Sequence, residues 1–559
     1  MPHQARAALA GAVLGLTLAT LALGPALSWG FVLIHDMVFV PDPAFSRFTF
    51  GLAGGAPRVV PSDAVVTALS QVLPGELVQK LILLAVFVLG ASGVAVLVPS
   101  PGLAPRLAAA AFYVWNPYVA ERLLIGQWAL LLGYAGLPWV VHALCRGRRL
   151  AVSLLPAATG GFAAMLVTAV TALPVAALLR RPARAGAADG DHRGPWARVL
   201  RTGVVLGAFC LPWLVPAALR PHGLAGDPVG VEAFASRADT PFGTLGSLLS
   251  LGGIWNANAV PVGYGEVVGA VARLLLTVVG IAAFVRLGRG LPYRNGLALA
   301  GVIGFAIAGA GVTEAGRSAL KWLVGVWGGF AVFRDAQQYV APVALLAAVG
   351  IGLLAAAAAR VPGAVAEAGR VPEAEPERVP AAGRDRGRRA PAGVLAGLLV
   401  AVPVAVLPTM AWGALGALDA VPYPRAWYEA RVTLRDDPAP GDVLVLPFES
   451  YRRFDWNGGR PVLDPAQRFF AVPGRRVVTN DVVRVGELVV RSEDPRATEV
   501  ERVLEGRSPD LAGLGFRYVI VDAGTVEECK RFADWLRDAE VVVDAPELRL
   551  YRLEPSRTP

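Results

Sequence analysis

The sequence predicts a polytopic α-helical membrane protein with about nine full spans, a re-entrant helix pair and a C-terminal extracytoplasmic α/β domain. The first observation is composition: of 559 residues, 55% are hydrophobic and 17% are charged, and the mean hydropathy is +0.52. Soluble domains of ordinary composition are less apolar. The second observation is that apolar runs long enough to cross a bilayer recur along the chain. The third is that the final segment is polar and alternates strand-like with helix-like stretches.

Each predicted span is a run of about 20 apolar residues, the length that crosses the hydrocarbon core of a bilayer. The first run is long for a signal peptide and many others follow it, so we expect an uncleaved first helix whose apolar character continues to Ile34. A shorter run at 107–120 also qualifies if it tilts little. The longer runs lie near residues 7–29, 77–98, 123–144, 198–219, 267–286, 291–312, 336–359 and 391–413.

Residues 150–179 do not fit this series of single crossings. The segment is too short for two full crossings, yet both of its flanks are strongly basic. A re-entrant helix pair resolves the conflict, because such a segment is tolerated where it is buried in protein. We expect its hinge at Gly160 and Gly161.

Arginine-rich loops predict the orientation in the membrane, because loops with an excess of Lys and Arg stay in the cytoplasm. We expect a multi-pass plasma-membrane protein with a cytoplasmic N-terminus and with everything after Met410 outside. The predicted cytoplasmic loops are 145–149, 180–194, 286–294 and 360–390. The predicted outer segments are 30–76, 220–266, 313–335 and 414–559.

Two domains are expected, a membrane domain over 1–413 and an extracytoplasmic domain over 414–559. Within the first, residues 360–390 are rich in Pro, Ala, Glu and Arg and predict a flexible cytoplasmic linker. In the second, helical apolar spacing predicts a helix over 525–539. Strands are predicted from the short apolar runs GDVLVLPF (441–448), FRYVIVD (516–522) and ELRLYRLE (547–554).

Several classes of function are disfavoured. The three cysteines, Cys145, Cys210 and Cys529, are scattered and predict neither a disulfide framework nor a zinc site. The net charge of +9 is explained by the arginine-rich loops, so we expect no nucleic-acid partner. No P-loop, dinucleotide-binding glycine motif or serine nucleophile elbow is present.

Two carboxylates follow the first apolar run in the stretch HDMVFVPD, at Asp36 and Asp42. A carboxylate at the membrane boundary is most often simply solvated. Here the acids form a pair in a long, moderately polar loop with aromatic residues, and a partly desolvated carboxylate is a stronger base. His35 adjoins Asp36 and has no second ligand nearby in sequence, so we expect it to tune the acid.

An acidic first outer loop directly after the first transmembrane helix resembles the GT-C superfamily of integral membrane glycosyltransferases. The resemblance implies a polyprenyl-phosphate-linked sugar donor, a glycan acceptor of the cell envelope and an inverting transfer at the outer face. It also implies that Asp36 is the general base and Asp42 the second acid. Mg²⁺ or Mn²⁺ is the candidate cofactor, and none is certain. The Ala-, Arg- and Gly-rich, Lys-poor composition suggests a high-GC bacterium and hence an arabinosyl- or mannosyltransferase of actinobacterial type.

A second polar group lies in WNPYVAERLLIGQW (115–128), where Glu121, Arg122 and Gln127 interrupt apolar sequence. Polar residues are costly there and are often functional. Glu121 and Arg122 are expected either to form an ion pair or to bind substrate and donor phosphate at the mouth of the outer cavity.

Arg334 is the main candidate for the donor phosphate, because a guanidinium offers a fixed fork of donors to phosphate oxygens. The alternative is that its neighbour Asp335 neutralises it, and the resemblance favours the phosphate role. Asp335 and Gln338 are expected to contact substrate.

The tail stretch ESYRRFDWNGGRPVLDPAQRFF (449–470) combines aromatic rings with planar polar groups, which suits carbohydrate. Trp456 is its candidate sugar-binding residue. The same composition also describes a loop that packs on the membrane domain.

Two other classes of function remain as alternatives. One is a transporter or flippase for a lipid-linked saccharide, which should show broken helices at the midplane and internal repeats. The other is a non-catalytic scaffold for envelope assembly.

Overall fold

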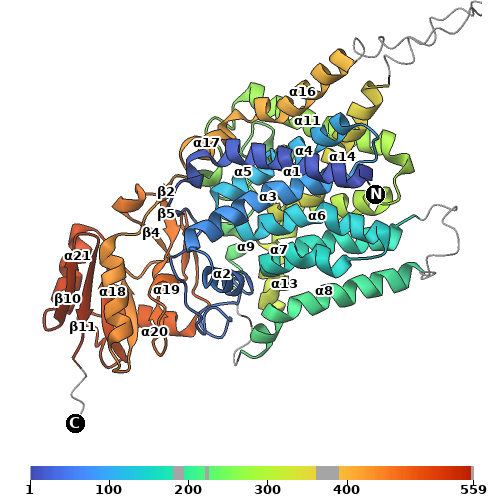
Figure 1. The fold of residues 1–559 in the computed structure, drawn as a ribbon. Helices are drawn as coiled ribbons and strands as arrows, with labels where there is room; N and C mark the ends of the chain where they lie inside the picture. Colours follow the sequence, from blue (N-terminus) through green and yellow to red (C-terminus); the bar gives the residue numbers. More distant parts are fainter. Residues whose placement is uncertain (1, 181–193, 221–223, 225, 361–388, 555–559) are drawn as a thin grey trace, which may run out of the picture.

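The computed structural model describes residues 2–180, 194–220, 224, 226–360 and 389–554. A bundle of helices forms the larger part of the molecule, and the sheet-containing C-terminal region lies at the end of the bundle remote from the N-terminus (Figure 1). The structure thus confirms a polytopic helical protein with a C-terminal α/β region. Most of two predicted cytoplasmic segments, 180–194 and 360–390, falls outside the described residues.

The bundle contains fewer clear spans than the nine predicted. Among the described residues, seven helices are long and apolar enough to cross a membrane, and α12 with α13 makes an eighth if this pair, bent by 92°, counts as one span. The run at 107–120 gives only a 12-residue helix, about 18 Å long, which is too short for a bilayer. The bundle helices are α1 (Pro2–Leu23), α3 (Gly75–Leu97), α4 (Leu103–Val114), α6 (Trp128–Arg146), α7 (Leu150–Leu178), α8 (Pro195–Ala218), α11 (Val267–Leu287), α12 (Arg294–Ala310), α14 (Ala341–Ala358) and α16 (Arg389–Val406).

Shorter helices lie mostly at the end of the bundle that faces the sheet. They belong to segments that the sequence assigns to the outer side or to the span ends. They are α2 (Ser62–Ser70), α5 (Pro117–Leu124), α9 (Gly230–Ala233), α10 (Gly243–Leu249), α13 (Glu314–Val326) and α17 (Ala411–Leu415).

The predicted hinge in 150–179 is confirmed. Helix α7 breaks at Gly161, whose φ of 74° and ψ of −149° are not helical. Before the break, Pro156 contacts Gly136 of α6, and after it Ala164 contacts Gly133, one turn away on the same helix. The two parts of α7 therefore run back along each other, as a re-entrant pair does.

The first helix ends earlier than predicted. Helix α1 stops at Leu23, and the chain continues through a 3-10 turn at Gly24–Leu27 into β1 (Phe31–Val32). Pro25 explains the end, since the residue before a proline disfavours helical geometry. Strand β1 pairs antiparallel with β2 (Ala420–Val421), so the loop with Asp36 is tied to the C-terminal region.

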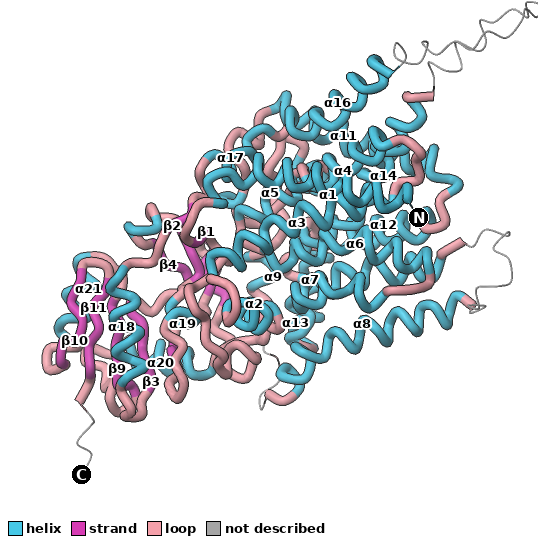
Figure 2. The backbone as a smooth tube through the Cα atoms, in the orientation of Figure 1, coloured by secondary structure: helices cyan, strands magenta, loops and turns pink. Residues whose placement is uncertain are grey.

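The C-terminal region contains a five-stranded sheet in the order β10-β11-β9-β3-β6, seen together in Figure 2. Strand β3 runs parallel to its neighbours β6 and β9, and the remaining pairs are antiparallel. The strands predicted at 441–448, 516–522 and 547–554 and the helix at 525–539 are all present. The sheet comprises β3 (Asp442–Leu446), β6 (Val477–Val478), β9 (Phe516–Val521), β10 (Glu540–Ala545) and β11 (Leu548–Arg552).

Helices cover both faces of this sheet. Leu444 and Leu446 of β3 pack in one core with residues of α20 and α21, and Val443 and Val445 pack in the other with residues of α18. This division follows from the alternation of side chains along a strand. The helices of this region are α18 (Arg425–Asp436), α19 (Ala466–Phe469), α20 (Pro495–Leu504) and α21 (Val526–Trp535).

A small hairpin joins the sheet region to the first outer loop. It consists of β4 (Tyr451–Arg453) and β5 (Pro461–Leu463), and a second hairpin consists of β7 (Val483–Val485) and β8 (Leu488–Val490). The backbone N–H of His35 donates to the Pro461 carbonyl at 2.6 Å, and the N–H of Leu463 donates back to the His35 carbonyl at 2.8 Å. The hairpin β4–β5 therefore fixes the residue directly before Asp36.

Candidate active site

A cavity of about 430 Å³ lies between the helical bundle and the C-terminal region. It brings together segments far apart in sequence, including the first outer loop, the tip of α7, the end of α8, the segment before α14 and the hairpin β4–β5. Four residues predicted for the site line it: Asp36, Arg334, Asp335 and Gln338. Gln127, from the polar group at 115–128, lines it as well.

The cavity has walls of two kinds. Phe162 and Trp213, from α7 and α8, pack with ring centroids 4.4 Å apart and form an apolar wall with Phe234. The opposite side carries polar groups of the C-terminal region, among them Tyr451 and Glu493. An amphipathic ligand with an apolar chain and a polar head fits such a site.

Asp36 is held in a tight turn. Its backbone N–H donates to the Ile125 carbonyl at 3.0 Å, and the N–H of Met37 donates to the Ile34 carbonyl at 2.8 Å. The turn lies directly against Gly126, which has a φ of 82°. A Cβ atom at Gly126 would lie 2.1 Å from the Met37 nitrogen, so only glycine permits this approach.

Tyr451 orients the Asp36 carboxylate. Its hydroxyl donates a hydrogen bond of 2.5 Å to Asp36 Oδ1. Burial, and then the charge of Asp36, raise the pKa of Tyr451 well above its ordinary value, although Arg58 and Arg334 oppose the rise. Tyr451 is therefore a protonated donor at neutral pH. Within the described part of the chain, no side chain donates to the other oxygen, Oδ2.

Arg334 is buried with one nitrogen unsatisfied. Its guanidinium carbon lies 4.7 Å from the centre of the Phe234 ring, and Nη1 lies 3.6 Å from Glu493 Oε1. Among the described residues, Nη1 has no hydrogen-bond partner. Burial, and then the charge of Arg58, lower the pKa of Arg334 to about 9, which leaves it charged at neutral pH. This is a cation with spare capacity for an anionic ligand.

In the described part of the chain the side chains of Arg334 and Asp335 form no hydrogen bond with each other, although the negative charge of Asp335 raises the pKa of Arg334. Asp335 instead accepts two hydrogen bonds from Arg122, at 2.8 and 3.2 Å. Arg122 is fully buried and also donates to Gln127 and Gln337. Its terminal nitrogens Nη1 and Nη2 are therefore both occupied, and the side chain does not line the cavity. The structure gives Arg122 the position of a support for Asp335 and Gln127 and not that of a phosphate ligand.

Glu121 also lies outside the cavity. It is completely buried, and its Oε2 accepts a hydrogen bond of 3.3 Å from Gln337. Arg122 donates its hydrogen bonds to other partners. Glu121 and Arg122 therefore do not form the mutual ion pair that was the alternative. A direct substrate contact by Glu121 is not supported by this position.

Asp42 and His35 do not line the cavity either. The Asp42 side chain is 77% exposed and contacts Arg431 at 3.4 Å, away from Asp36. His35 is buried, and burial lowers the pKa of its imidazole, so the ring is neutral at pH 7. His35 acts on the site through its backbone, which has a φ of 44° and pairs with β5.

Trp456 is part of a structural aromatic cluster and does not line the cavity. It stacks on Phe454 with centroids 5.0 Å apart and contacts Tyr423 and Trp427. Of the two interpretations of the 449–470 stretch, packing against the rest of the protein explains Trp456.

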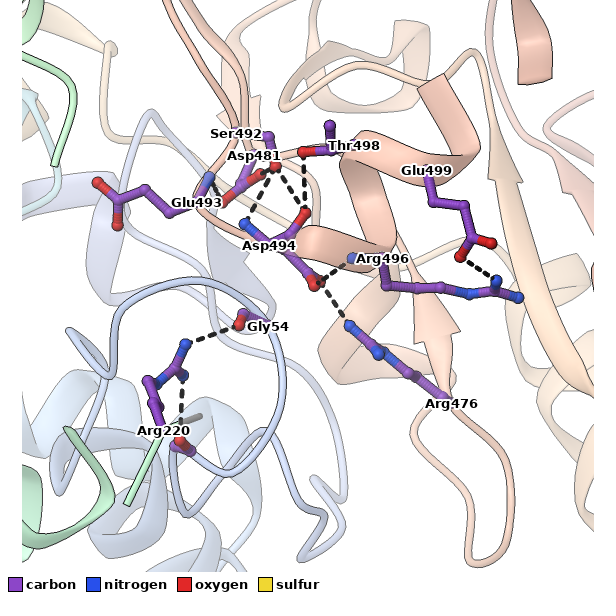
Figure 3. Close-up of polar contacts among 11 residues, drawn as sticks. Gly54, Arg220, Arg476, Asp481, Ser492, Glu493, Asp494, Arg496, Thr498 and Glu499 are labelled. Atoms are coloured by element: carbon purple, nitrogen blue, oxygen red, sulfur yellow. Dashed lines mark hydrogen bonds and ion pairs between the residues drawn. The ribbon is translucent and has the colours of Figure 1, made fainter. Parts of the chain in front are cut away.

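Among the cavity-lining residues that sequence reasoning missed are Arg58, Tyr451 and Glu493. Arg58 and Tyr451 lie in stretches that the sequence singles out, but nothing local distinguishes them from other arginines and tyrosines. Glu493 extends from the start of α20 away from the C-terminal region, as Figure 3 shows. Only the folded chain brings these three groups together.

The remaining question about the chemistry of the site is whether its acidic residues form a metal-binding cluster. In the described ranges, no group of three or more His, Cys, Asp or Glu residues is arranged to hold a metal ion.

Comparison with known proteins gives one informative likeness. No protein-family model and no curated protein matches the sequence. A cryo-EM structure of arabinofuranosyltransferase AftD from Mycobacteria superposes with a TM-score of 0.55 at 17% identity, over 99% of this chain and 42% of that one. The chain therefore spans about two fifths of the length of that protein. At this identity the likeness concerns the fold. The chain accordingly shares the fold of the aligned part of that membrane protein.

Proposed function

We propose that this protein is a membrane glycosyltransferase that transfers a sugar from a polyprenyl-phosphate donor to a glycan acceptor of the cell envelope. The observation that carries the proposal is the cavity, which exposes the Asp36 carboxylate and an unsatisfied buried guanidinium beside an apolar wall. The structural likeness to an arabinofuranosyltransferase favours arabinofuranose over mannose as the sugar.

In this mechanism Asp36 is the general base. Its Oδ1 is held by Tyr451, which leaves Oδ2 to accept the proton of the acceptor hydroxyl. The hydroxyl oxygen then forms a bond to the anomeric carbon as the bond from that carbon to the phosphate oxygen breaks. The displacement inverts the anomeric centre. Proton removal by a positioned carboxylate contributes ~10²–10⁴-fold to rate.

The leaving phosphate is stabilised by Arg334, with Arg58 as a second cation. Both guanidinium groups approach Glu493, so their charges converge on one part of the cavity. A guanidinium binds the donor phosphate in the ground state and stabilises the charge that develops on it during transfer.

The apolar wall accommodates the first isoprene units of the donor. Trp213 belongs to α8, and only 17% of the most apolar stretch of that helix is buried in the protein. This side of the cavity therefore adjoins the lipid-facing surface. The donor enters from the bilayer, and the acceptor enters from the C-terminal side. We place the C-terminal region outside the cytoplasm on this basis and on the distribution of arginine.

The proposal is tested by sugar transfer in membranes that contain the full chain. Labelled polyprenyl-phosphate arabinose, polyprenyl-phosphate mannose and a nucleotide sugar are offered with a glycan acceptor. We expect transfer from the lipid-linked donors only, and an Arg334→Ala variant should raise KM for the donor. Arg425→Ala, whose side chain is 92% exposed, is the control. Uptake of the intact lipid-linked sugar without transfer would instead favour a transporter.

A further inference from the structure

The anion site proposed above contains an acid. Glu493 has a side chain that is only 7% exposed, and its Oε1 contacts both Arg58 and Arg334. Burial raises the pKa of Glu493, but Arg58 and Arg334 outweigh it and hold the pKa below its usual range, so the group is ionised. One carboxylate therefore faces two guanidinium groups.

The fit between these three groups is incomplete. Glu493 approaches Arg58 within hydrogen-bond distance but leaves Arg334 Nη1 at 3.6 Å, too far for a good hydrogen bond. That nitrogen is buried and has no other partner among the described residues. An unsatisfied buried donor is destabilising, and more so if it is charged, so the arrangement gains from any ligand that satisfies it.

The backbone around Glu493 is fixed, and its side chain, which lines the cavity, extends away from Asp494 (Figure 3). The Glu493 N–H donates to Asp481 Oδ2 at 3.0 Å, and Ser492 also bonds to Asp481. Asp494 caps α20 by accepting from the Arg496 N–H at 3.0 Å. The Glu493 Oε2 also accepts a hydrogen bond of 3.4 Å from the Ala56 N–H. Displacing the carboxylate therefore breaks this bond and the ion pairs, while the bonds that hold the Glu493 backbone remain.

The facing loop is fixed as well. Arg220 donates to the carbonyl oxygens of Gly54 and Gly51 at 3.0 and 3.1 Å, four residues or more before Arg58. The Arg58 side chain itself is 49% exposed and is free to follow a ligand. The guanidinium groups of Arg58 and Arg334 thus both approach the Glu493 carboxylate.

We propose that Glu493 is a resident counter-ion in this site and that a phosphate group binds by displacing the Glu493 carboxylate from Arg58 and Arg334. The inference rests on the proposed function for the identity of the anion. A phosphate offers more acceptor oxygens in tetrahedral directions than a carboxylate, so it reaches both cations at once. Glu493 then selects against weak anions, because only a ligand that outcompetes a carboxylate enters.

The test measures anion binding directly, by calorimetry on the full chain in detergent. The probes are geranyl phosphate and inorganic phosphate. Glu493→Gln should tighten binding by about tenfold or more, equivalent to ~1.4 kcal/mol, because the competing charge is removed. Glu499→Gln is the matched control, since Glu499 pairs with Arg496 at 2.7 Å and does not line the cavity, and it should change nothing.

The outcomes separate the inference from the proposed function. If Glu493→Gln leaves binding unchanged or weakens it, the inference is overturned. Glu493→Asp keeps the charge but has a shorter side chain, and it should also tighten binding. This variant replaces Glu493→Gln in the test if the Gln variant does not fold. Arg334→Ala should weaken binding of both probes, and failure to do so would refute the phosphate role itself. Tighter binding of geranyl phosphate identifies the lipid as the source of the anion, and equal binding identifies free phosphate.

Discussion

Replacing Gly126 by alanine should impair catalysis by moving the turn that holds Asp36. Gly126 has a φ of 82°, and a non-glycine residue in the left-handed region costs about 1–2 kcal/mol. The larger effect is steric. The new Cβ would lie 2.1 Å from the Met37 nitrogen, and real Cβ atoms keep about 3.0 Å. The turn or the helix connection must therefore shift by about 0.9 Å.

A displacement of this size next to the general base is large for a catalytic geometry. A misplacement of about 1 Å can reduce turnover by ~10²-fold. We expect a fall of that order in kcat for sugar transfer, with donor binding largely retained because Arg334 lies on another segment. Binding is measured by calorimetry and transfer with a labelled donor.

The control for this change is Gly301→Ala. Gly301 lies in α12, and a Cβ there meets nothing closer than 3.5 Å, so alanine should fold and turn over normally. Wild-type kcat in Gly126→Ala, together with a wild-type unfolding midpoint, would refute the argument that this close approach positions Asp36.

Three further changes have distinct expected results. Tyr451→Phe removes the hydrogen bond to Asp36 Oδ1 and should lower kcat with little change in donor KM; an increase in KM alone would contradict its orienting role. Asp42→Asn should leave transfer within about twofold of wild type in the same assay, because a surface ion pair contributes little. Asp522 lies directly after β9, where it is buried and accepts a hydrogen bond from Arg452. Burial raises the pKa of Asp522 to about 7, above its unfolded value near 4, so the folded state binds the proton more tightly and stability falls as pH rises through 7. Thermal unfolding of Asp522→Asn should be less pH-dependent between pH 5 and 8, and an unchanged profile would contradict the assignment.

Much of the fold could be predicted because membrane proteins obey strong compositional rules. The apolar runs predicted the helices, and the basic flanks of 150–179 predicted the re-entrant pair. Its hinge was predicted at Gly161. The strands at 441–448 and 516–522 followed from short apolar runs. Hydropathy does not show where a helix ends: Pro25 stops α1 before the end of the predicted run, and the run at 107–120 holds only a 12-residue helix.

The site was predicted in part. Asp36, Arg334 and Asp335 reach one cavity, as their chemistry suggested. Arg122 could not be separated from a ligand-binding arginine by sequence, because its partner Asp335 lies far along the chain. Glu493 could not be identified from the sequence for the same reason, since its role depends on a contact with Arg334.

The most direct test of the central claim is single-turnover sugar transfer by Asp36→Asn, with donor binding measured on the same preparation. Asparagine preserves size and can still accept the Tyr451 hydrogen bond, but it cannot take the acceptor proton. The account predicts that transfer falls by ~10²–10⁴-fold while donor binding is unchanged. Transfer at the wild-type rate by a correctly folded Asp36→Asn protein would contradict it.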